Sequence, residues 1–238
     1  MRNNILENEM DGIFVVVPAK DEAENIGKVL KKIKRYCKDI ILVDDGSKDS
    51  TKKIGKKEGV IVIRHITNLG KGAALKTGCD YAFSIGAKKV IAIDADGQHD
   101  PNDIPRFAEA VKTCDIVFGA RTFNRNMPYL LKFGNRFINM VTRFLYGIKL
   151  KDTQCGYRAF TANAYKKIRW NSYDYSMESE MISNAGRHKL KYKEITIDTV
   201  YSDKYKGTTV FDGIKIVMNL FYWKLRDTGN SGKNNQVN

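Results

Sequence analysis

Two aspartates one residue apart and a glutamine two positions further on, Asp94, Asp96 and Gln98, could together hold a divalent cation. They follow the apolar segment 89–93, which has the composition of a buried strand. Residues i and i+2 of an extended segment point the same way, so the three side chains can converge. Mg²⁺ prefers oxygen ligands and usually completes its shell with substrate phosphates and water. An acidic turn that caps the next helix is the plainer interpretation, but this spacing favours the metal.

Two more apolar segments end in acidic residues. Segment 39–43 leads into Asp44 and Asp45, and segment 12–17 leads into a loop that carries Glu22. In an open α/β sheet, ligands bind outside the carboxyl ends of the strands. Helix capping accounts for individual Asp, Ser and Thr residues at such positions, but not for carboxylates at three strand ends.

The first half of the chain alternates between strand and helix patterns. We expect strands at 13–17, 39–43, 60–64, 89–93 and 115–119, and helices at 22–36, 50–58, 71–85 and 102–112. This rhythm predicts an α/β fold with a mostly parallel central sheet and helices on both faces. Beyond residue 121 we expect helices at 128–147 and 175–187 and strands at 152–160 and 192–201.

The organisation that follows is a single catalytic domain with short appendages. We expect a flexible leader over 1–11, a domain over 12–209, an amphipathic helix over 210–227 and a disordered tail over 228–238. The leader shows no signal-peptide pattern, and no segment is long and apolar enough to span a membrane. Four cysteines without a CxxC pair indicate reduced thiols, so we expect a cytoplasmic protein.

The 238 residues carry a formal net charge of +14. Nucleic acid and an anionic membrane surface are the two partners that such a charge suggests. No nucleic-acid-binding motif occurs, and the basic residues are dispersed rather than clustered with aromatic residues. A nucleic-acid-binding module is therefore the rival from a different class, and we expect no nucleic acid partner.

Two other α/β enzyme classes are excluded by the loop after the first strand. A dinucleotide oxidoreductase would place a G-x-G-x-x-G motif there. A sugar nucleotidyltransferase would carry a Gly-rich, Arg-containing phosphate loop at the same position. This chain has Pro18-Ala19-Lys20-Asp21-Glu22 instead.

Six short segments in order carry a family resemblance: Pro18-Ala19-Lys20-Asp21-Glu22, Asp44-Asp45-Gly46-Ser47, Asn68-Leu69-Gly70-Lys71-Gly72, Asp94-Ala95-Asp96-Gly97-Gln98, Gly119-Ala120-Arg121 and Gln154-Cys155-Gly156-Tyr157-Arg158. In these segments the chain resembles the metal-dependent, inverting GT-A glycosyltransferases of family 2 that include dolichyl-phosphate mannosyl- and glucosyltransferases. The resemblance runs from about residue 13 to 213.

The resemblance implies a nucleotide-sugar donor, a Mg²⁺ or Mn²⁺ cofactor, and a role for each matching residue. Contacts with the base and ribose are implied for Pro18, Ala19, Glu22 and Asp45. Asp94 and Asp96 would lie at the diphosphate, with Asp96 and Gln98 as direct metal ligands. Arg121 and Arg158 would face the acceptor. Further substrate contacts are implied for Lys71, Arg136, Gln154, Glu180, Lys204 and Lys206.

Two departures from the family pattern matter. Asp21 stands where the family usually has Asn, and the loop containing Lys204 and Lys206 lacks the family's arginine. A lysine supplies charge but not a bidentate fork. The donor stays open between GDP-mannose, UDP-glucose and UDP-N-acetylglucosamine, and the altered loop favours a UDP-sugar.

The implied acceptor is a polyprenyl or dolichyl phosphate on the cytoplasmic face of a membrane. Two basic amphipathic segments, 128–147 and 210–225, fit helices that lie in the membrane interface. The alternatives for the apolar face of 210–225 are packing on the protein core, contact with a second subunit in a homodimer, or contact with a separate membrane partner. A soluble or cell-surface glycan is the alternative acceptor.

Overall fold

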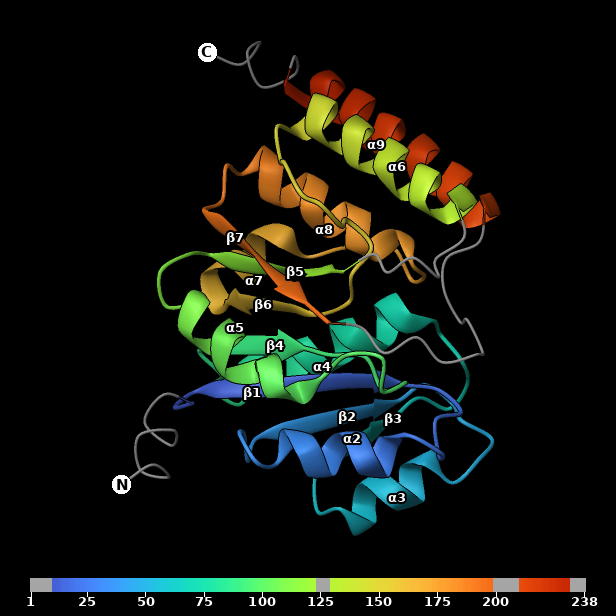
Figure 1. The fold of residues 1–238 in the computed structure, drawn as a ribbon, viewed down its shortest axis with the longest axis vertical. Helices are drawn as coiled ribbons and strands as arrows, with labels where there is room; N and C mark the ends of the chain where they lie inside the picture. The colour runs from blue at the N-terminus through green and yellow to red at the C-terminus, as the bar shows by residue number, and fades with distance from the viewer. Residues whose placement is uncertain (1–9, 123–128, 199–209, 232–238) are drawn as a thin grey trace.

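The computed structural model describes residues 10–122, 129–198 and 210–231. Its centre is a seven-stranded sheet in the order β3-β2-β1-β4-β6-β5-β7 (Figure 1). The strands are β1 (Ile13–Ala19), β2 (Ile40–Asp44), β3 (Ile61–Arg64), β4 (Lys89–Ala92), β5 (Ile116–Arg121), β6 (Arg158–Thr161) and β7 (Tyr192–Ile197). All pairs are parallel except those of β6, which is antiparallel to β4 and β5. The expected α/β fold is confirmed.

Helices cover both faces of the sheet. One face packs against α2 (Ile26–Ile33), α3 (Thr51–Lys57) and α5 (Ile104–Ala110), and the other against α4 (Lys71–Ser84), α7 (Ala162–Ile168) and α8 (Ser176–Arg187). A short 3₁₀ turn, η1 (Pro101–Asp103), precedes α5. Strands β1 and β2 are almost entirely buried because apolar side chains on both of their faces meet a helical layer.

A pair of long helices, α6 (Tyr129–Tyr146) and α9 (Val210–Ser231), lies side by side beyond α8, at the β7 end of the sheet (Figure 1). Ile138 and Val141 of α6 pack against Ile216 and Leu220 of α9 in a small core of their own. The Tyr146 hydroxyl donates a hydrogen bond of 2.7 Å to the Leu220 carbonyl oxygen. The two helices therefore form one unit with an inner, buried seam.

Polar contacts join this helix pair to the rest of the domain. Lys215 of α9 forms an ion pair of 2.5 Å with Asp174, and Asn219 donates a hydrogen bond to Ser176 at the start of α8. Asn139 of α6 donates to the Lys151 carbonyl oxygen at 2.6 Å. Both helices are thus attached to segments that lead to the carboxyl edge of the sheet.

Several element boundaries differ from the sequence expectation. Helix α7 was not predicted, and the strand expected over 152–160 is a loop until β6 begins at Arg158. Helix α2 is shorter than the expected 22–36, because Glu22 and Asn25 form the turn that precedes it. Met10, placed in the flexible leader, is buried in the core.

The C-terminal boundary also differs. Helix α9 continues to Ser231, beyond the expected end at 227 and into the segment predicted to be disordered. Residues 1–9, 199–209 and 232–238, which include Lys204 and Lys206, lie outside the described residues.

Candidate active site

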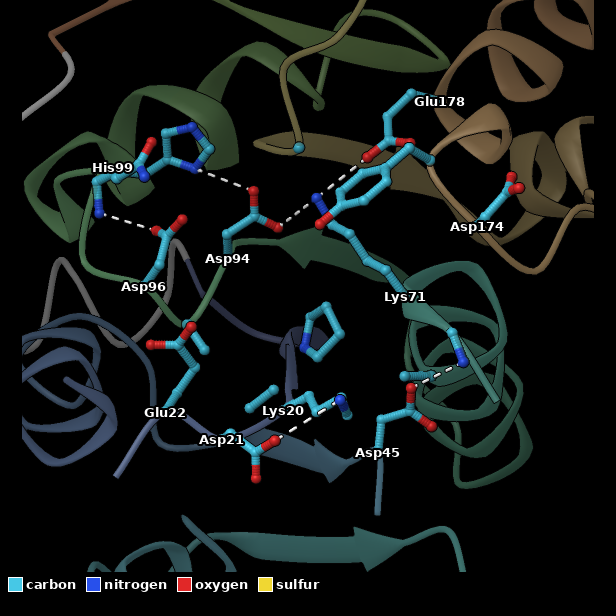
Figure 2. Close-up of a pocket in the computed structure, with 18 of the residues that line it drawn as sticks. Lys20, Asp21, Glu22, Asp45, Lys71, Asp94, Asp96, His99, Asp174 and Glu178 are labelled. Carbon is cyan, nitrogen blue, oxygen red and sulfur yellow. Dashed lines mark hydrogen bonds and ion pairs between the residues drawn. The ribbon is translucent and has the colours of Figure 1, made fainter. Parts of the chain in front are cut away.

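The carboxyl ends of β1, β2, β4 and β5 meet at one edge of the sheet, where the strand order reverses between β1 and β4. Because β6 is antiparallel, the loop before it arrives at this same edge. A pocket of about 590 Å³ opens there. Seven carboxylate side chains and three cationic side chains line it within the described residues (Figure 2). Such switch points are where open α/β sheets bind ligands.

The loop after β1 is fixed by hydrogen bonds to the loop after β2. The backbone amide of Asp21 donates to Ser47 Oγ, and that of Glu22 donates to Thr51 Oγ1, each at 2.9 Å. Asp21 has a φ of 53°, in the left-handed region. Asn and Asp tolerate this conformation better than other non-glycine residues. Asp21, which stands where the resembled family usually has Asn, is therefore compatible with the same loop geometry.

Asp45 holds the loop that leads into α4. Its carboxylate accepts hydrogen bonds from the amides of Leu69 and Gly70 at 2.9 and 2.8 Å. His65 Nδ1 lies 2.7 Å from the same carboxylate, and His65 Nε2 lies 3.0 Å from Thr77 Oγ1. Asp45 therefore lines the pocket and also fixes the shape of its wall.

Lys71, the first residue of α4, lies between two carboxylates (Figure 2). Its Nζ is 2.8 Å from Asp94 Oδ1 and 3.1 Å from Glu178 Oε1. Burial alone would lower the pKa of Lys71, but the two carboxylates outweigh burial and raise it. Burial acts to raise the pKa of Asp94, and the Lys71 charge reverses this so that the pKa is lowered. Lys71 and Asp94 are therefore both charged at neutral pH.

Asp96 lies beside this cluster without a cationic partner of its own among the described residues. Its Oδ1 accepts a hydrogen bond of 2.9 Å from the Gln98 amide. Burial and the negative charge of Asp94 raise the pKa of Asp96 to about 6. A carboxylate whose ionisation is opposed in this way gains from a bound cation.

Gly156 allows the approach of the loop before β6 to this cluster. A Cβ atom at this position would lie 2.4 Å from Asp94 Oδ2. Any side chain there would displace the Asp94 carboxylate. The sequence Gln154-Cys155-Gly156 thus has a steric reason for its glycine.

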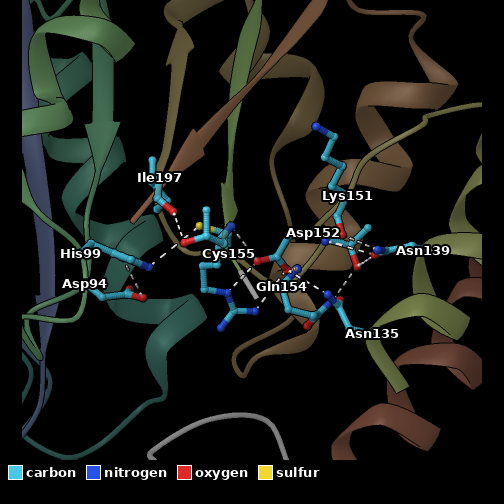
Figure 3. A network of polar contacts seen from close by, with 12 residues as sticks. Asp94, His99, Asn135, Asn139, Lys151, Asp152, Gln154, Cys155 and Ile197 are labelled. Atoms are coloured by element: carbon cyan, nitrogen blue, oxygen red, sulfur yellow. Dashed lines mark hydrogen bonds and ion pairs between the residues drawn. The ribbon is translucent and has the colours of Figure 1, made fainter. Parts of the chain in front are cut away.

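Arg121, at the end of β5, is held against Asp152, a carboxylate that Figure 3 shows beside Asn135 and Gln154. Its Nε and Nη2 lie 2.6 and 3.1 Å from the two carboxylate oxygens of Asp152. The same carboxylate accepts hydrogen bonds from the Gln154 amide and from Asn135 of α6. Burial acts to raise the pKa of Asp152, but Arg121 holds it below its usual range. The network fixes the Arg121 guanidinium at the pocket wall.

The structure brings most of the predicted site residues into one pocket. It places there Pro18, Ala19, Glu22, Asp45, Lys71, Asp94, Asp96, Gln98, Arg121 and Gln154. Arg136 is exposed on α6 and does not line the pocket, and Lys204 and Lys206 lie outside the described residues.

Arg158 requires a correction. We expected it to face the acceptor, but it is 1% exposed, and its guanidinium donates to the carbonyl oxygens of Cys155, Glu178 and Thr153 at 2.9–3.0 Å. The side chain holds the β6 loop against α8 inside the protein. Its role is structural.

Glu180 is the second correction. It faces away from the pocket and accepts hydrogen bonds from the amides of Asn171 and Ser172. Glu178, which was not predicted as a site residue, lines the pocket instead. Residues i and i+2 of a helix lie on nearly opposite sides, so only one of the two can face the ligand.

Other pocket residues were also missed. His99, Asp174 and Tyr175 line the pocket without having been predicted as site residues. Asp152, which falls in an expected strand, does not line the pocket but fixes Arg121 at its wall. Burial lowers the pKa of His99 to about 4, so this imidazole is neutral near its neighbour Asp94. The available signal for Asp174 and Tyr175 was their position at the start of the helix expected over 175–187.

The donor set fits a hard divalent cation that is shared with a ligand. No group of three His, Cys, Asp or Glu residues in the described ranges is arranged to hold a metal by itself. Mg²⁺ sites in phosphate-transfer enzymes commonly use one or two carboxylates and the substrate phosphates. Asp96 and Gln98 supply oxygen ligands of this kind, next to a pocket with excess negative charge.

A mostly parallel sheet with a ligand pocket at its switch point, and one antiparallel strand beside it, matches the GT-A fold. The family model of glycosyl transferase family 2 matches residues 14–169, and the chain belongs to this family. Its members are inverting glycosyltransferases.

Relatives cover nearly the whole chain. A UDP-N-acetylglucosamine–dolichyl-phosphate N-acetylglucosaminyltransferase of Methanococcus voltae is 34% identical, over 90% of this chain and 96% of that protein. A polyprenol monophosphomannose synthase of Mycolicibacterium smegmatis is 26% identical, over 92% and 88%. Glucosyl-3-phosphoglycerate synthase from Mycobacterium tuberculosis, solved with Mg²⁺ and UDP, shares the fold with a TM-score of 0.72 at 19% identity, over 91% of this chain and 82% of that one.

Gly156→Ala should lower sugar transfer by about a hundredfold, since small displacements of reacting groups have effects of this size. The added methyl would push Asp94 away from Lys71. Initial rates, with donor affinity by calorimetry, measure the effect. Gly134→Ala in α6 is the matched control, because nothing lies within 4 Å of its Cβ position. Equal activity of the two variants would contradict the steric argument.

Arg158→Met should destabilise the protein by at least about 3 kcal/mol, because three buried carbonyl oxygens lose a charged donor. Denaturant unfolding measures the loss, and Arg136→Met on the surface of α6 should leave stability nearly unchanged. A stable Arg158→Met protein that binds donor but fails only with the acceptor would restore the original substrate-contact role.

Proposed function

We propose that this glycosyltransferase uses a UDP-sugar, with Mg²⁺ or Mn²⁺, and transfers the sugar to a polyprenyl phosphate. The observation that carries the proposal is the charge of the pocket. Among the described residues, seven carboxylates and three cations line it, so an anionic nucleotide diphosphate would be repelled without an added cation. The relatives named for dolichyl-phosphate and polyprenol substrates support the acceptor class.

Asp96 and Gln98 would hold the cation at the end of β4, and donor phosphates would complete its shell. When bound, the cation acts as a Lewis acid that neutralises the charge growing on the nucleotide diphosphate as the sugar leaves. Lys71 keeps Asp94 charged and in place beside this site. The loops fixed by Ser47 and Asp45 would form the walls around the base and ribose.

The acceptor phosphate is the nucleophile in this proposal. A phosphomonoester has a second pKa of ~6, so it is largely ionised at neutral pH and needs little help from a general base. It does need a cation to approach the donor diphosphate without repulsion. Arg121, fixed by Asp152 at the pocket wall, would supply this charge.

The outer face of the α6–α9 pair would rest on the membrane that contains the acceptor. It exposes Phe144, Met140, Met218, Tyr222 and Leu225, at 60–85% of their surface. No helix of the described residues is both long enough and apolar enough to cross a bilayer. Helices with such a face lie in the interface, and nearby basic residues favour an anionic leaflet on the cytoplasmic side.

The alternatives to this proposal differ in the donor and in the acceptor. GDP-mannose would replace the UDP-sugar if the base-contacting loops favour guanine. The M. smegmatis relative is named for a phosphomannose product. A soluble or cell-surface glycan would replace the lipid. The apolar face would then pack against a second copy or another membrane protein.

A donor panel tests the reaction directly. With Mn²⁺, a UDP-sugar should raise the unfolding temperature more than GDP-mannose does, since saturation at about 100 times Kd adds ~2.7 kcal/mol. Radiolabelled sugar should appear in a short-chain polyprenyl phosphate and not in a free glycan. Transfer to the glycan alone would refute the lipid acceptor, and a response to GDP-mannose alone would refute the UDP donor.

Asp96→Asn should reduce this transfer by at least about a hundredfold and abolish the Mn²⁺-dependent part of donor binding, because the metal loses a charged ligand. Asp11→Asn is the control. It removes a carboxylate from an exposed ion pair with Lys88, before β1 begins. Full activity of the wild type in excess EDTA would count against the metal.

Phe144→Ser combined with Leu225→Ser should lower binding to anionic liposomes by at least about tenfold, because both side chains are largely exposed and apolar. Activity on a water-soluble acceptor phosphate should persist. Ile66→Ser, another exposed apolar residue that follows β3, is the control and should not change liposome binding. A double mutant that still floats with liposomes but loses a dimer would assign the face to self-association.

A further inference from the structure

A second cavity, of about 180 Å³, lies where the C-terminal ends of α7 and α8 meet the second half of α9. Cationic side chains from three segments line it: Lys167, Arg169, Arg187 and Arg226. We call this the basic cavity. It shares no lining residue with the pocket at the strand ends.

The floor of the basic cavity is polar and ordered. Glu180 and Asn184 are 7% and 8% exposed and lie one turn apart on α8. Glu180 accepts hydrogen bonds from the Asn171 amide and from the amide and hydroxyl of Ser172, at 2.6–3.0 Å. Asn184 Nδ2 donates to the Arg169 carbonyl oxygen at 3.1 Å. These contacts fix the loop after α7, so the cavity has a defined shape.

The cations outnumber the carboxylates that face them. Arg169 pairs with the exposed Asp80, whereas Lys167 and Arg226 have no ion pair among the described residues. Basic residues at helix C-termini interact favourably with the helix dipole, which accounts for Lys167 and Arg187 taken singly. The helix dipole does not account for Arg226, which belongs to α9 and lines the same small cavity as the other three cationic side chains.

We propose that the basic cavity binds a phosphate group, separately from the donor and acceptor of the transfer reaction. Arginine side chains present forked donors that match phosphate oxygens, and the excess positive charge favours an anion. Trp223 and Arg226, which line the cavity, are each next in sequence to an exposed apolar residue, Tyr222 and Leu225. The phosphate therefore comes either from a lipid headgroup at this edge of α9 or from a free anion in solution.

Trp223 gives a local signal for the test. The chain has two tryptophans, and Trp170 is fully buried with its indole bonded to the Gly72 carbonyl oxygen. The full-length protein in EDTA is titrated with pyrophosphate at constant ionic strength, and tryptophan emission is followed. We expect a saturable change that disappears in Trp223→Phe.

Lys167→Gln with Arg187→Gln should weaken this binding at least about tenfold, because two charged hydrogen-bond donors are removed. Lys53→Gln with Lys56→Gln on α3 removes the same charge from an exposed helix far along the sheet and should leave binding unchanged. If the first double variant does not fold, Lys167→Gln alone replaces it, since this side chain is exposed.

Vesicles separate the two sources of phosphate. Phosphatidylcholine vesicles with and without phosphatidic acid are compared for binding by wild type, cavity variant and control. Saturation by pyrophosphate identifies a site for free phosphate, and a response only to phosphatidic acid identifies a headgroup site. No saturable response to either probe, or an equal loss in the cavity variant and the α3 control, would overturn the proposal.

Discussion

The pocket depends on one cation held between two carboxylates. Lys71 lies at the start of α4, Asp94 follows β4, and Glu178 belongs to α8, so a single ammonium group joins three elements that are distant in the sequence. Without Lys71, two largely buried carboxylates would face each other, and the repulsion would either protonate one of them or open the pocket. Because the Lys71 charge is already balanced by Asp94 and Glu178, the ionised form of the neighbouring Asp96 stays disfavoured. A bound metal ion would stabilise that ionised form.

The antiparallel strand β6 makes this arrangement possible. A parallel strand in its place would deliver its preceding loop to the opposite edge of the sheet. Because β6 runs the other way, the loop from Asp152 to Gly156 meets the ends of β4 and β5. Asp152 then fixes Arg121, and Gly156 lets the loop reach Asp94. One reversed strand therefore supplies two walls of the site.

The parallel half of the fold could be predicted from local pattern. Its strands are short apolar runs separated by helical patterns. The acidic residues that follow β1, β2 and β4 could therefore be predicted to lie together, as they do in the pocket. The later half could not, because tertiary contacts decide it. Arg158 resembles a substrate ligand in sequence, yet backbone carbonyl oxygens surround it. The choice between Glu178 and Glu180 depends on the rotation of α8 about its axis, which an apolar pattern on a largely buried helix does not determine.

The ties between the helix pair and the pocket have a thermodynamic consequence. Asp174 lines the pocket and also pairs with Lys215 of α9, while Asn135 of α6 bonds the carboxylate that fixes Arg121. Whatever stabilises this placement of α6 and α9 also stabilises this shape of the pocket wall. Linkage is reciprocal, so a surface that favours the helix pair in its observed position raises the affinity of the pocket for its ligands, and those ligands raise the affinity for the surface by the same factor.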